Sequence, residues 1–305
     1  MEILYALEKI RYASLDKLML LVTGLGSETV FLALALTMYW CVSKREGYYL
    51  VSVGFLGTIF NQFLKLYCRV PRPWVRNPNF TAVESALPGA SGYSFPSGHS
   101  QSAVGTFGVI GAETKRHWIR AVSIVLMLLV PFSRLYLGVH TPADVLVGGV
   151  CALVLVFSLR PLVYSSRKWV FPALLVVQAL CGLAFLAYVK LTDYPPDIDP
   201  GNLAHAAKNA YTLLGAMLGF LLAYFIEDRY IRFSVKAVWW AQVLKVLLGL
   251  TLAVAIKELL KVLFIHIFGD FMILHTLRYF LVVIFAALLW PMTFKWFAKL
   301  GGKWR

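Results

Sequence analysis

Apolar runs of about 20 residues recur along the whole chain, and they constrain its fold more than any other feature. A run of this length is what a helix needs to cross a hydrocarbon core of roughly 30 Å. Hydrophobic residues make up 60% of the 305 residues and charged residues 14%, whereas soluble domains carry about 25% charged residues. The sequence therefore predicts an all-α polytopic membrane protein, because a helix satisfies its own backbone hydrogen bonds inside lipid.

The apolar runs predict nine membrane spans, to within about one. Residues 1–22 precede them and are interpreted as an amphipathic helix lying on the membrane interface, ended by Gly24 and Gly26. We expect the spans near residues 28–43, 47–68, 99–113, 118–138, 142–164, 169–190, 206–226, 237–258 and 273–296. An acidic loop, 192–202, lies between the sixth and seventh spans.

The net charge of +14 does not indicate a nucleic-acid-binding protein, because the basic residues cluster in short loops between apolar runs. The short loops on one side carry more Lys and Arg, so that side is expected to be cytoplasmic. The loops 69–98 and 134–141 then face outward. This places them outside the plasma (inner) membrane of a bacterium, or in the lumen of the endoplasmic reticulum of a eukaryote.

The four cysteines show no paired spacing typical of a zinc site or a disulfide framework. They lie within or at the ends of apolar runs, and we expect them to be small buried residues. They are Cys41, Cys68, Cys151 and Cys181.

Three segments hold most of the unusual polar residues, and each lies where a span meets the same side of the membrane. They are KLYCRVPRP (65–73), PSGH (96–99) and SRLYLGVHTPAD (133–144). Each alone has an ordinary explanation: interfacial anchors, a turn with a helix N-cap, and a loop-to-helix junction. These separate explanations do not predict that three cations and two histidines all occur on one face.

The cations and small residues of these segments suit a phosphoryl group. Lys65, Arg72 and Arg134 would neutralise its oxygens, and arginine adds forked hydrogen bonds. Ser97 and the amide of Gly98 would add donors at the positive end of the helix that follows. Such preorganised charge is where we expect most of the rate enhancement.

The two histidines suit a two-step phosphoryl transfer. His140 is expected to be the nucleophile, and Asp144, one helical turn later, would hold its imidazole tautomer. His99 would protonate the leaving oxygen and then activate water. No carboxylate cluster for Mg²⁺ or Mn²⁺ lies near these segments, so we expect metal-independent catalysis with no cofactor.

Together the three segments resemble the three-part signature of the type 2 phosphatidic acid phosphatase superfamily, over about residues 47–164. The resemblance implies the same roles for His140, Asp144 and His99, and phosphate binding by Lys65, Arg72, Ser97, Gly98 and Arg134. It also implies a six-helix phosphatase core, which here would occupy 1–190 with the interfacial helix. Residues 191–305 would then add the acidic loop and about three further spans.

We therefore expect an integral membrane phosphatase that hydrolyses a phosphatidate-like or sphingoid-base phosphate through a phosphohistidine. Its partners would be the lipid substrate and the bilayer, and no nucleic acid. An undecaprenyl (polyprenyl) diphosphate phosphatase and a lipid phosphotransferase are the alternative enzymes. An anion or lipid transporter is the alternative outside enzymes, although transport does not require His140 and Asp144 at this spacing.

Three charged residues lie in or beside the apolar runs of the last part of the chain: Lys245, Glu258 and Arg278. Charges at membrane depth are candidates for function. The simplest arrangement is a Glu258–Arg278 pair between the last two helices, which would either fix their packing or serve a function.

Overall fold

The computed structural model describes residues 1–196 and 198–300, so residues 197 and 301–305 of the predicted extension lie outside the described part. The chain forms two compact units, which we describe separately. The first comprises Met1–Leu32, Tyr49–Pro161 and Tyr194–Ala206, and the second comprises Ala33–Tyr48, Leu162–Asp193 and the residues from Ala207 onward.

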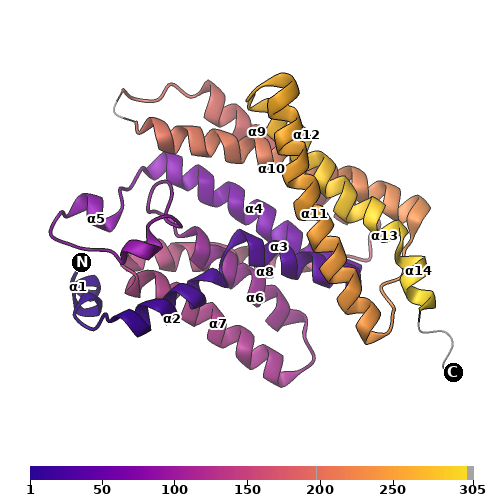
Figure 1. The fold of residues 1–305 in the computed structure, drawn as a ribbon, viewed down its shortest axis with the longest axis horizontal. Helices are drawn as coiled ribbons and strands as arrows, with labels where there is room; N and C mark the ends of the chain where they lie inside the picture. The colour runs from indigo at the N-terminus through magenta and orange to yellow at the C-terminus, as the bar shows by residue number, and fades with distance from the viewer. Residues whose placement is uncertain (197, 301–305) are drawn as a thin grey trace. The chain divides into compact units, whose positions relative to one another are not determined.

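Helices account for all the regular structure in the described residues (Figure 1). The first part of the chain contains α1 (Glu2–Glu8), α2 (Ala13–Gly24), α3 (Glu28–Thr37), a π-helical turn (Met38–Val42), α4 (Lys44–Cys68), α5 (Pro73–Arg76), a 3₁₀ turn (Glu84–Ala86), α6 (Gly98–Glu113), α7 (His117–Tyr136) and α8 (Pro142–Val163). The second part contains α9 (Val170–Leu191), α10 (Pro200–Ile226), a π-helical turn (Glu227–Ile231), α11 (Trp239–Phe268), α12 (Ile273–Ile284), a π-helical turn (Phe285–Leu289), α13 (Trp290–Met292) and α14 (Phe294–Lys299).

A helix lies at each of the nine predicted spans, but the predicted number of spans is too high. Six helical segments in the described residues are long and apolar enough to cross a membrane. The number becomes seven if α2 and the helix Glu28–Val42, which are bent by 46°, form one span. One reason is that α6 has only 16 residues, and at 1.5 Å per residue it falls short of the roughly 30 Å core.

The prediction of one amphipathic helix over residues 1–22 is also wrong. The segment forms two helices, α1 and α2, separated at residues 9–12. Asp16 of α2 accepts a hydrogen bond from the Tyr136 hydroxyl at 2.8 Å, and Met19 belongs to the same buried apolar cluster as Leu137 and Val139. Polar and apolar side chains of α2 thus hold it against the C-terminal end of α7, a tertiary contact that no local pattern reveals.

Helix α6 forms the centre of the first unit, beside α7 (Figure 1). Most of its first three turns are buried, although its sequence mixes small polar and apolar residues. Gln101 accepts a hydrogen bond from Asn61 of α4 at 2.8 Å, so the buried amides satisfy each other. At the break after α2, a Cβ on Gly26 would lie 2.7 Å from the His99 carbonyl oxygen, so only glycine allows this approach to α6.

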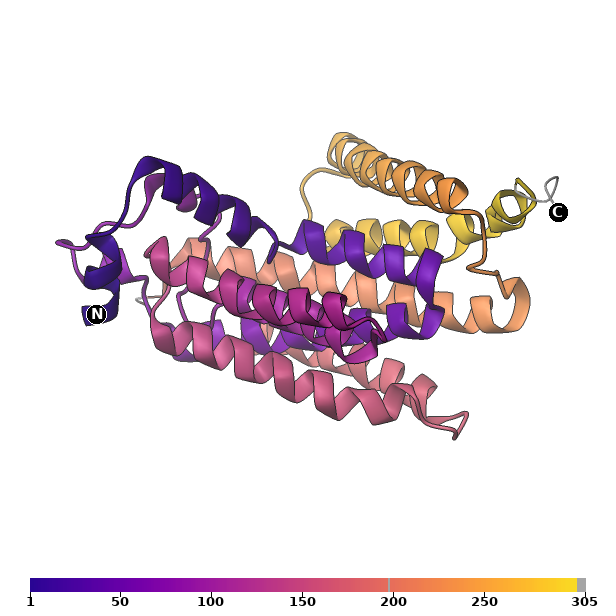
Figure 2. The ribbon, with the colours of Figure 1, turned by 90° about the horizontal axis from the view of Figure 1, so that it is seen from below.

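In the second unit, α11 and α12 form an antiparallel pair joined by a short turn (Figure 2). Lys245 of α11 is fully buried, and its ammonium donates to the carbonyls of Trp40 and Val235 at 3.1 and 3.2 Å. It also lies 4.3 Å from the centre of the Phe294 ring. Carbonyls and an aromatic face therefore stabilise this buried cation, which indicates a structural role.

The predicted Glu258–Arg278 pair does not form. Glu258 is exposed and pairs with the adjacent Lys257 at 3.0 Å. Arg278 is buried and bonds instead to Nδ1 of His275 at 3.1 Å. The pair fails because the Glu258 side chain lies on an exposed face of α11, whereas the Arg278 side chain is enclosed.

All four cysteines are free, but none is fully buried, so the prediction of buried cysteines is wrong. Cys41, Cys151 and Cys181 are partly buried. Cys68 is exposed because it is the last residue of α4.

Candidate functional site

The three polar segments meet within the first unit. Lys65 lies in the last turn of α4, and Arg72 precedes α5. Ser97 is the N-cap of α6, and Arg134 lies in the last turn of α7. The loop 137–141 then carries His140 to the start of α8. The predicted site residues are therefore brought together by the ends of four successive long helices.

His140 and Asp144 form a buried pair, as their spacing of one helical turn predicts. Nδ1 of His140 lies 3.4 Å from Oδ2 of Asp144, and both side chains are 2% exposed. The same carboxylate oxygen accepts hydrogen bonds from the Thr141 amide at 2.7 Å and from the Ser94 hydroxyl at 2.5 Å. Asp144 is thus held in place beside the imidazole by two donors.

Arg72 identifies the imidazole nitrogen that carries the lone pair. Its Nη1 lies 2.9 Å from Nε2 of His140, and a guanidinium can only donate. Nε2 is therefore the acceptor, and in a neutral ring the proton is on Nδ1, facing Asp144. This tautomer presents the unprotonated nitrogen toward the cations of the site.

The other contacts of Arg72 and those of Lys65 are with backbone carbonyls. Arg72 donates to the carbonyls of Gly92 at 3.0 Å, Ser91 at 2.7 Å and Val139 at 2.9 Å. The Lys65 ammonium donates to the Tyr93 carbonyl. The segment 91–93 therefore binds two of the predicted cations through neutral oxygens.

Arg134 is buried, but its hydrogen-bonding capacity is mostly unused. Only 1% of its surface is exposed, and Nη1 donates to the Thr23 hydroxyl at 2.9 Å. Nε and Nη2 are buried and have no hydrogen-bond partner among the described residues. Unsatisfied donors of a buried cation are costly, so this arrangement favours an anionic ligand that would accept from them.

The N-terminus of α6 is held in place by the hydrogen bonds of Ser97. Ser97 is fully buried, its amide donates to the Asp144 carbonyl at 2.9 Å, and its hydroxyl accepts from the Ser100 hydroxyl at 2.8 Å. A Cβ on Gly98 would meet only Asn61 Oδ1, at an ordinary 3.6 Å. Packing alone therefore does not require glycine at position 98. His99, in the first turn of α6, is half-buried.

Burial and the surrounding positive charges both act on the protonation of His140. The pKa of His140 lies well below its usual value, first because of burial and then because of the positive charges of Arg72, Arg134 and Lys65. His99 contributes in the same direction. His140 is therefore neutral at pH 7, the form in which an imidazole is a nucleophile.

Three contributors were not predicted from the sequence. Ser94 lies two residues before the PSGH segment and gave no signal beyond its proximity. Thr23 lies in α2, directly after the segment 1–22 that was predicted to lie on the membrane interface. Gly148 of α8 packs on Ser97, because a Cβ there would lie 2.6 Å from the Ser97 carbonyl oxygen. No group of three metal-ligating side chains occurs in the part of the chain that the structure describes, and metal independence stays a prediction.

Comparison with known proteins places the chain among membrane phosphatases. The PAP2 superfamily matches residues 45–187, and the transmembrane extension of PAP2 superfamily phosphatases matches residues 211–303. Undecaprenyl-diphosphatase BcrC of Bacillus subtilis is 30% identical over 188 residues, which cover 60% of this chain and 89% of the relative. No solved structure matches.

Two further relatives have other substrates in their names. Phosphatidylglycerophosphatase B of Bacillus subtilis is 29% identical over 164 residues, 50% of this chain and 76% of the relative. A probable sphingosine-1-phosphate phosphatase of Dictyostelium discoideum is 26% identical over 248 residues, 75% of this chain and 58% of the relative. With all three polar segments inside the matched region, the chain belongs to the PAP2 superfamily: it is a membrane phosphatase of lipid phosphates or diphosphates, with the family's transmembrane extension.

Proposed function

We propose that the protein hydrolyses a lipid phosphate through a phosphohistidine on His140, without a metal ion, on the outer or lumenal face of its membrane. The observation that carries the proposal is the setting of His140. Its Nε2 faces the guanidinium of Arg72, and its Nδ1 faces Asp144. A phosphate oxygen that displaced Nε2 from Arg72 would leave the lone pair of Nε2 free to attack phosphorus.

In the first step, Nε2 of His140 forms a bond to phosphorus while the bond from phosphorus to the lipid oxygen breaks. The imidazole becomes positively charged, and the Asp144 carboxylate stabilises it through Nδ1–H. The phosphoryl oxygens take the unused donors of Arg134, together with Arg72 and Lys65. His99 gives a proton to the departing lipid oxygen. Burial and the charges of Arg134, Arg72 and Lys65 lower the pKa of His99 to about 3 in the empty site, so this step requires that the negative charge of the bound phosphate raise that pKa.

In the second step, water attacks the phosphohistidine. His99, now neutral, accepts the proton of the water, and the N–P bond breaks to release phosphate. The electron pair of that bond returns to Nε2, which restores neutral His140. The cycle consumes one water and needs no further reactant.

The membrane setting and the relatives support two substrate classes. A site at the ends of membrane helices suits a phosphate whose apolar tail stays in the bilayer. The relative that aligns along 89% of its length is named an undecaprenyl-diphosphatase. This name supports a polyprenyl diphosphate as the substrate. The relative aligned over 75% of this chain is named for a sphingosine phosphate, which supports a lipid monophosphate as the second candidate.

Division of the chain into a phosphatase core, 1–190, and an extension, 191–305, is part of the proposal. The family matches at 45–187 and 211–303 support it.

The test is phosphate release by the purified protein in the presence of a chelator. The panel contains polyprenyl diphosphate, phosphatidate, sphingosine phosphate and phosphatidylglycerophosphate. We expect release that vanishes in His140→Ala and persists in the matched control His117→Ala, since His117 is exposed at the start of α7. With a substrate labelled in its phosphoryl group, rapid quenching should trap label on the wild-type protein. Label that is lost in acid and stable in base would identify the phosphohistidine.

The outcomes separate the alternatives. Full activity of His140→Ala would overturn the assigned nucleophile. Activity that the chelator abolishes and Mg²⁺ restores would overturn metal independence. Label that moves from the protein to an added lipid alcohol in preference to water would identify a phosphotransferase.

A further inference from the structure

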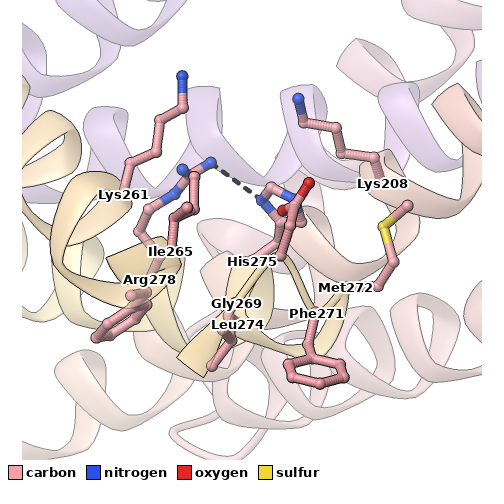
Figure 3. A pocket seen from close by; sticks show the side chains of 11 residues that line it. Lys208, Lys261, Ile265, Gly269, Phe271, Met272, Leu274, His275 and Arg278 are labelled. Atoms are coloured by element: carbon pink, nitrogen blue, oxygen red, sulfur yellow. Dashed lines mark hydrogen bonds between the residues drawn. The ribbon is translucent and has the colours of Figure 1, made fainter. Parts of the chain in front are cut away.

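A second cluster of cations lies in the transmembrane extension, within the second unit. It lines a pocket of about 170 Å³ formed by the C-terminal end of α11, the turn 269–272, the start of α12 and one residue of α10. We name it the extension pocket. Its polar lining residues are Lys208, Lys261, Asp270, His275 and Arg278 (Figure 3).

The charge of the extension pocket is unbalanced. Lys208, Lys261 and Arg278 carry three positive charges, whereas Asp270 is the sole carboxylate among the lining residues. None of the three cations forms an ion pair with a carboxylate within the described residues. Figure 3 shows Lys261 and Lys208 on either side of the Arg278–His275 pair, extending in the same direction.

Arg278 is the buried centre of the cluster. It is 7% exposed, and Nη2 bonds to Nδ1 of His275 at 3.1 Å. Its Nε is buried with no hydrogen-bond partner in the described part of the chain. Because an unsatisfied donor on a buried cation is costly, an acceptor that bound in this pocket would be stabilised.

The surroundings indicate which kind of anion fits. The start of α12 adds the positive end of a helix dipole. Ile265, Phe271 and Met272 also line the pocket and are exposed apolar residues, and Phe271 points away from the Arg278–His275 pair (Figure 3). The pocket lies at the start of α12, which begins a segment long and apolar enough to cross a membrane. Cations beside exposed apolar side chains at such a position are suited to a lipid head group, with its acyl chains against the apolar surface.

We propose that the extension pocket is a second, non-catalytic phosphate site that binds the phosphate of an anionic membrane lipid. The shared chemistry is a tetrahedral phosphate held by Arg278, Lys208 and Lys261. Inorganic phosphate offers the same oxygens without the apolar tail. The site lies in residues outside the three-part signature, so it does not depend on hydrolysis at His140.

The test measures binding of a phosphodiester, which carries no terminal phosphate for the phosphatase to remove. The full-length protein in neutral detergent is titrated with short-chain phosphatidylglycerol, with short-chain phosphatidylcholine and with inorganic phosphate. The variants are Lys208→Gln, Lys261→Gln and Arg278→Gln. The matched control is Lys168→Gln, which removes the same charge from an exposed lysine outside the pocket.

We expect phosphatidylglycerol to bind more tightly than the other two probes. Each of Lys208→Gln and Lys261→Gln should weaken its binding by roughly tenfold, the usual effect of one charge-assisted hydrogen bond, and Lys168→Gln should not. The two exposed lysines keep the test valid if Arg278→Gln fails to fold. Phosphate release from the substrate panel, measured beside the binding, reports the catalytic site separately.

Inorganic phosphate could bind as tightly as phosphatidylglycerol and lose affinity in the lysine variants. This result would support the phosphate site but contradict a lipid as its ligand. Lysine-dependent binding of phosphatidylcholine at the same affinity would overturn the requirement for a net negative lipid. Binding of all probes that is unchanged by Lys208→Gln and Lys261→Gln would overturn the site itself.

Discussion

At the scale of single residues, Arg134 shows a conflict between stability and ligand binding. Its guanidinium is enclosed, with Nε and Nη2 unpartnered in the described residues and Nη1 bonded to Thr23. Burying these donors costs free energy in the empty protein. Sites that bind anions commonly retain such costs, because the ligand removes them.

The first prediction concerns this conflict. Arg134→Gln should lower kcat/KM by about 10²- to 10³-fold, the usual effect of removing one preorganised donor of transition-state charge. Without ligand, its midpoint of thermal unfolding should equal or exceed that of the wild type. Added phosphate should raise the midpoint of the wild type but not of the variant. A variant that is less stable than wild type and still stabilised by phosphate would contradict this account.

The second prediction concerns the pH dependence of stability through His140. The pKa of His140 is lowered by burial and by the neighbouring cations, so the unfolded chain binds this proton more readily than the folded one. Stability therefore falls as pH drops below about 6.5, the ordinary pKa of histidine. The fall from this single group is at most about 1.4 kcal/mol per pH unit.

The glutamine side chain of His140→Gln is neutral at every pH. The stability of this variant should therefore fall less steeply than that of the wild type as the pH is lowered. Thermal unfolding of both proteins without phosphate, from neutral to mildly acidic pH, gives the comparison. Parallel pH profiles of the two proteins would mean that His140 is not held neutral by its surroundings.

The residues of the candidate site differ in how visible they are in the sequence. Lys65, Arg72, His140 and the PSGH residues are conspicuous because polar residues are rare in an apolar chain. Ser94 and Thr23 are small hydroxyl residues with many ordinary uses. They join the candidate site through hydrogen bonds with Asp144 and Arg134, and these contacts depend on tertiary structure and not on sequence spacing.

At the scale of helices, two adjacent glycines of α8 distinguish the effect of tertiary packing from the effect of helix propensity. Gly148 lies against the backbone of Ser97, where a Cβ would come within 2.6 Å of the carbonyl oxygen. A Cβ on Gly149 would meet only a side-chain atom of Val104, at 3.7 Å. The start of α8 therefore sets the position of the α6 N-terminus through Gly148 and through the Asp144 carbonyl, which accepts from the Ser97 amide.

The third prediction uses this pair. Gly148→Ala should destabilise the protein by about 1–3 kcal/mol, because backbone must move to relieve the overlap. It should also lower kcat, because Ser97 and Gly98 move with the start of α6. Gly149→Ala should be neutral or stabilising by up to about 1 kcal/mol, the helix propensity of alanine over glycine. Thermal unfolding and phosphate release of the two variants test this, and equal effects would contradict it.

The sequence predicted the positions of the helices better than it predicted which of them cross the membrane. Each of the nine predicted spans contains a helix, because apolar runs between polar loops dictate helix in a membrane chain. The number of helices that cross the membrane and the break of the N-terminal segment depend on helix length and on packing. For α2, Asp16 bonds to Tyr136, so the polar residues that predicted an interfacial helix are partly used inside the protein.

At the scale of the whole molecule, an exposed cysteine can report which face of the membrane carries the candidate site. Cys68 ends α4, in the turn after Lys65, and is exposed, whereas the other three cysteines are partly buried. The bias of Lys and Arg in the short loops predicts that this end of α4 faces outward. A membrane-impermeant maleimide should therefore label Cys68 from the outside of intact spheroplasts that express the protein. Cys68→Ser should remove the label. Labelling of the wild type only after permeabilisation would place Lys65 and the residues around it on the cytoplasmic face, and the substrate would then have to be presented from the inner leaflet.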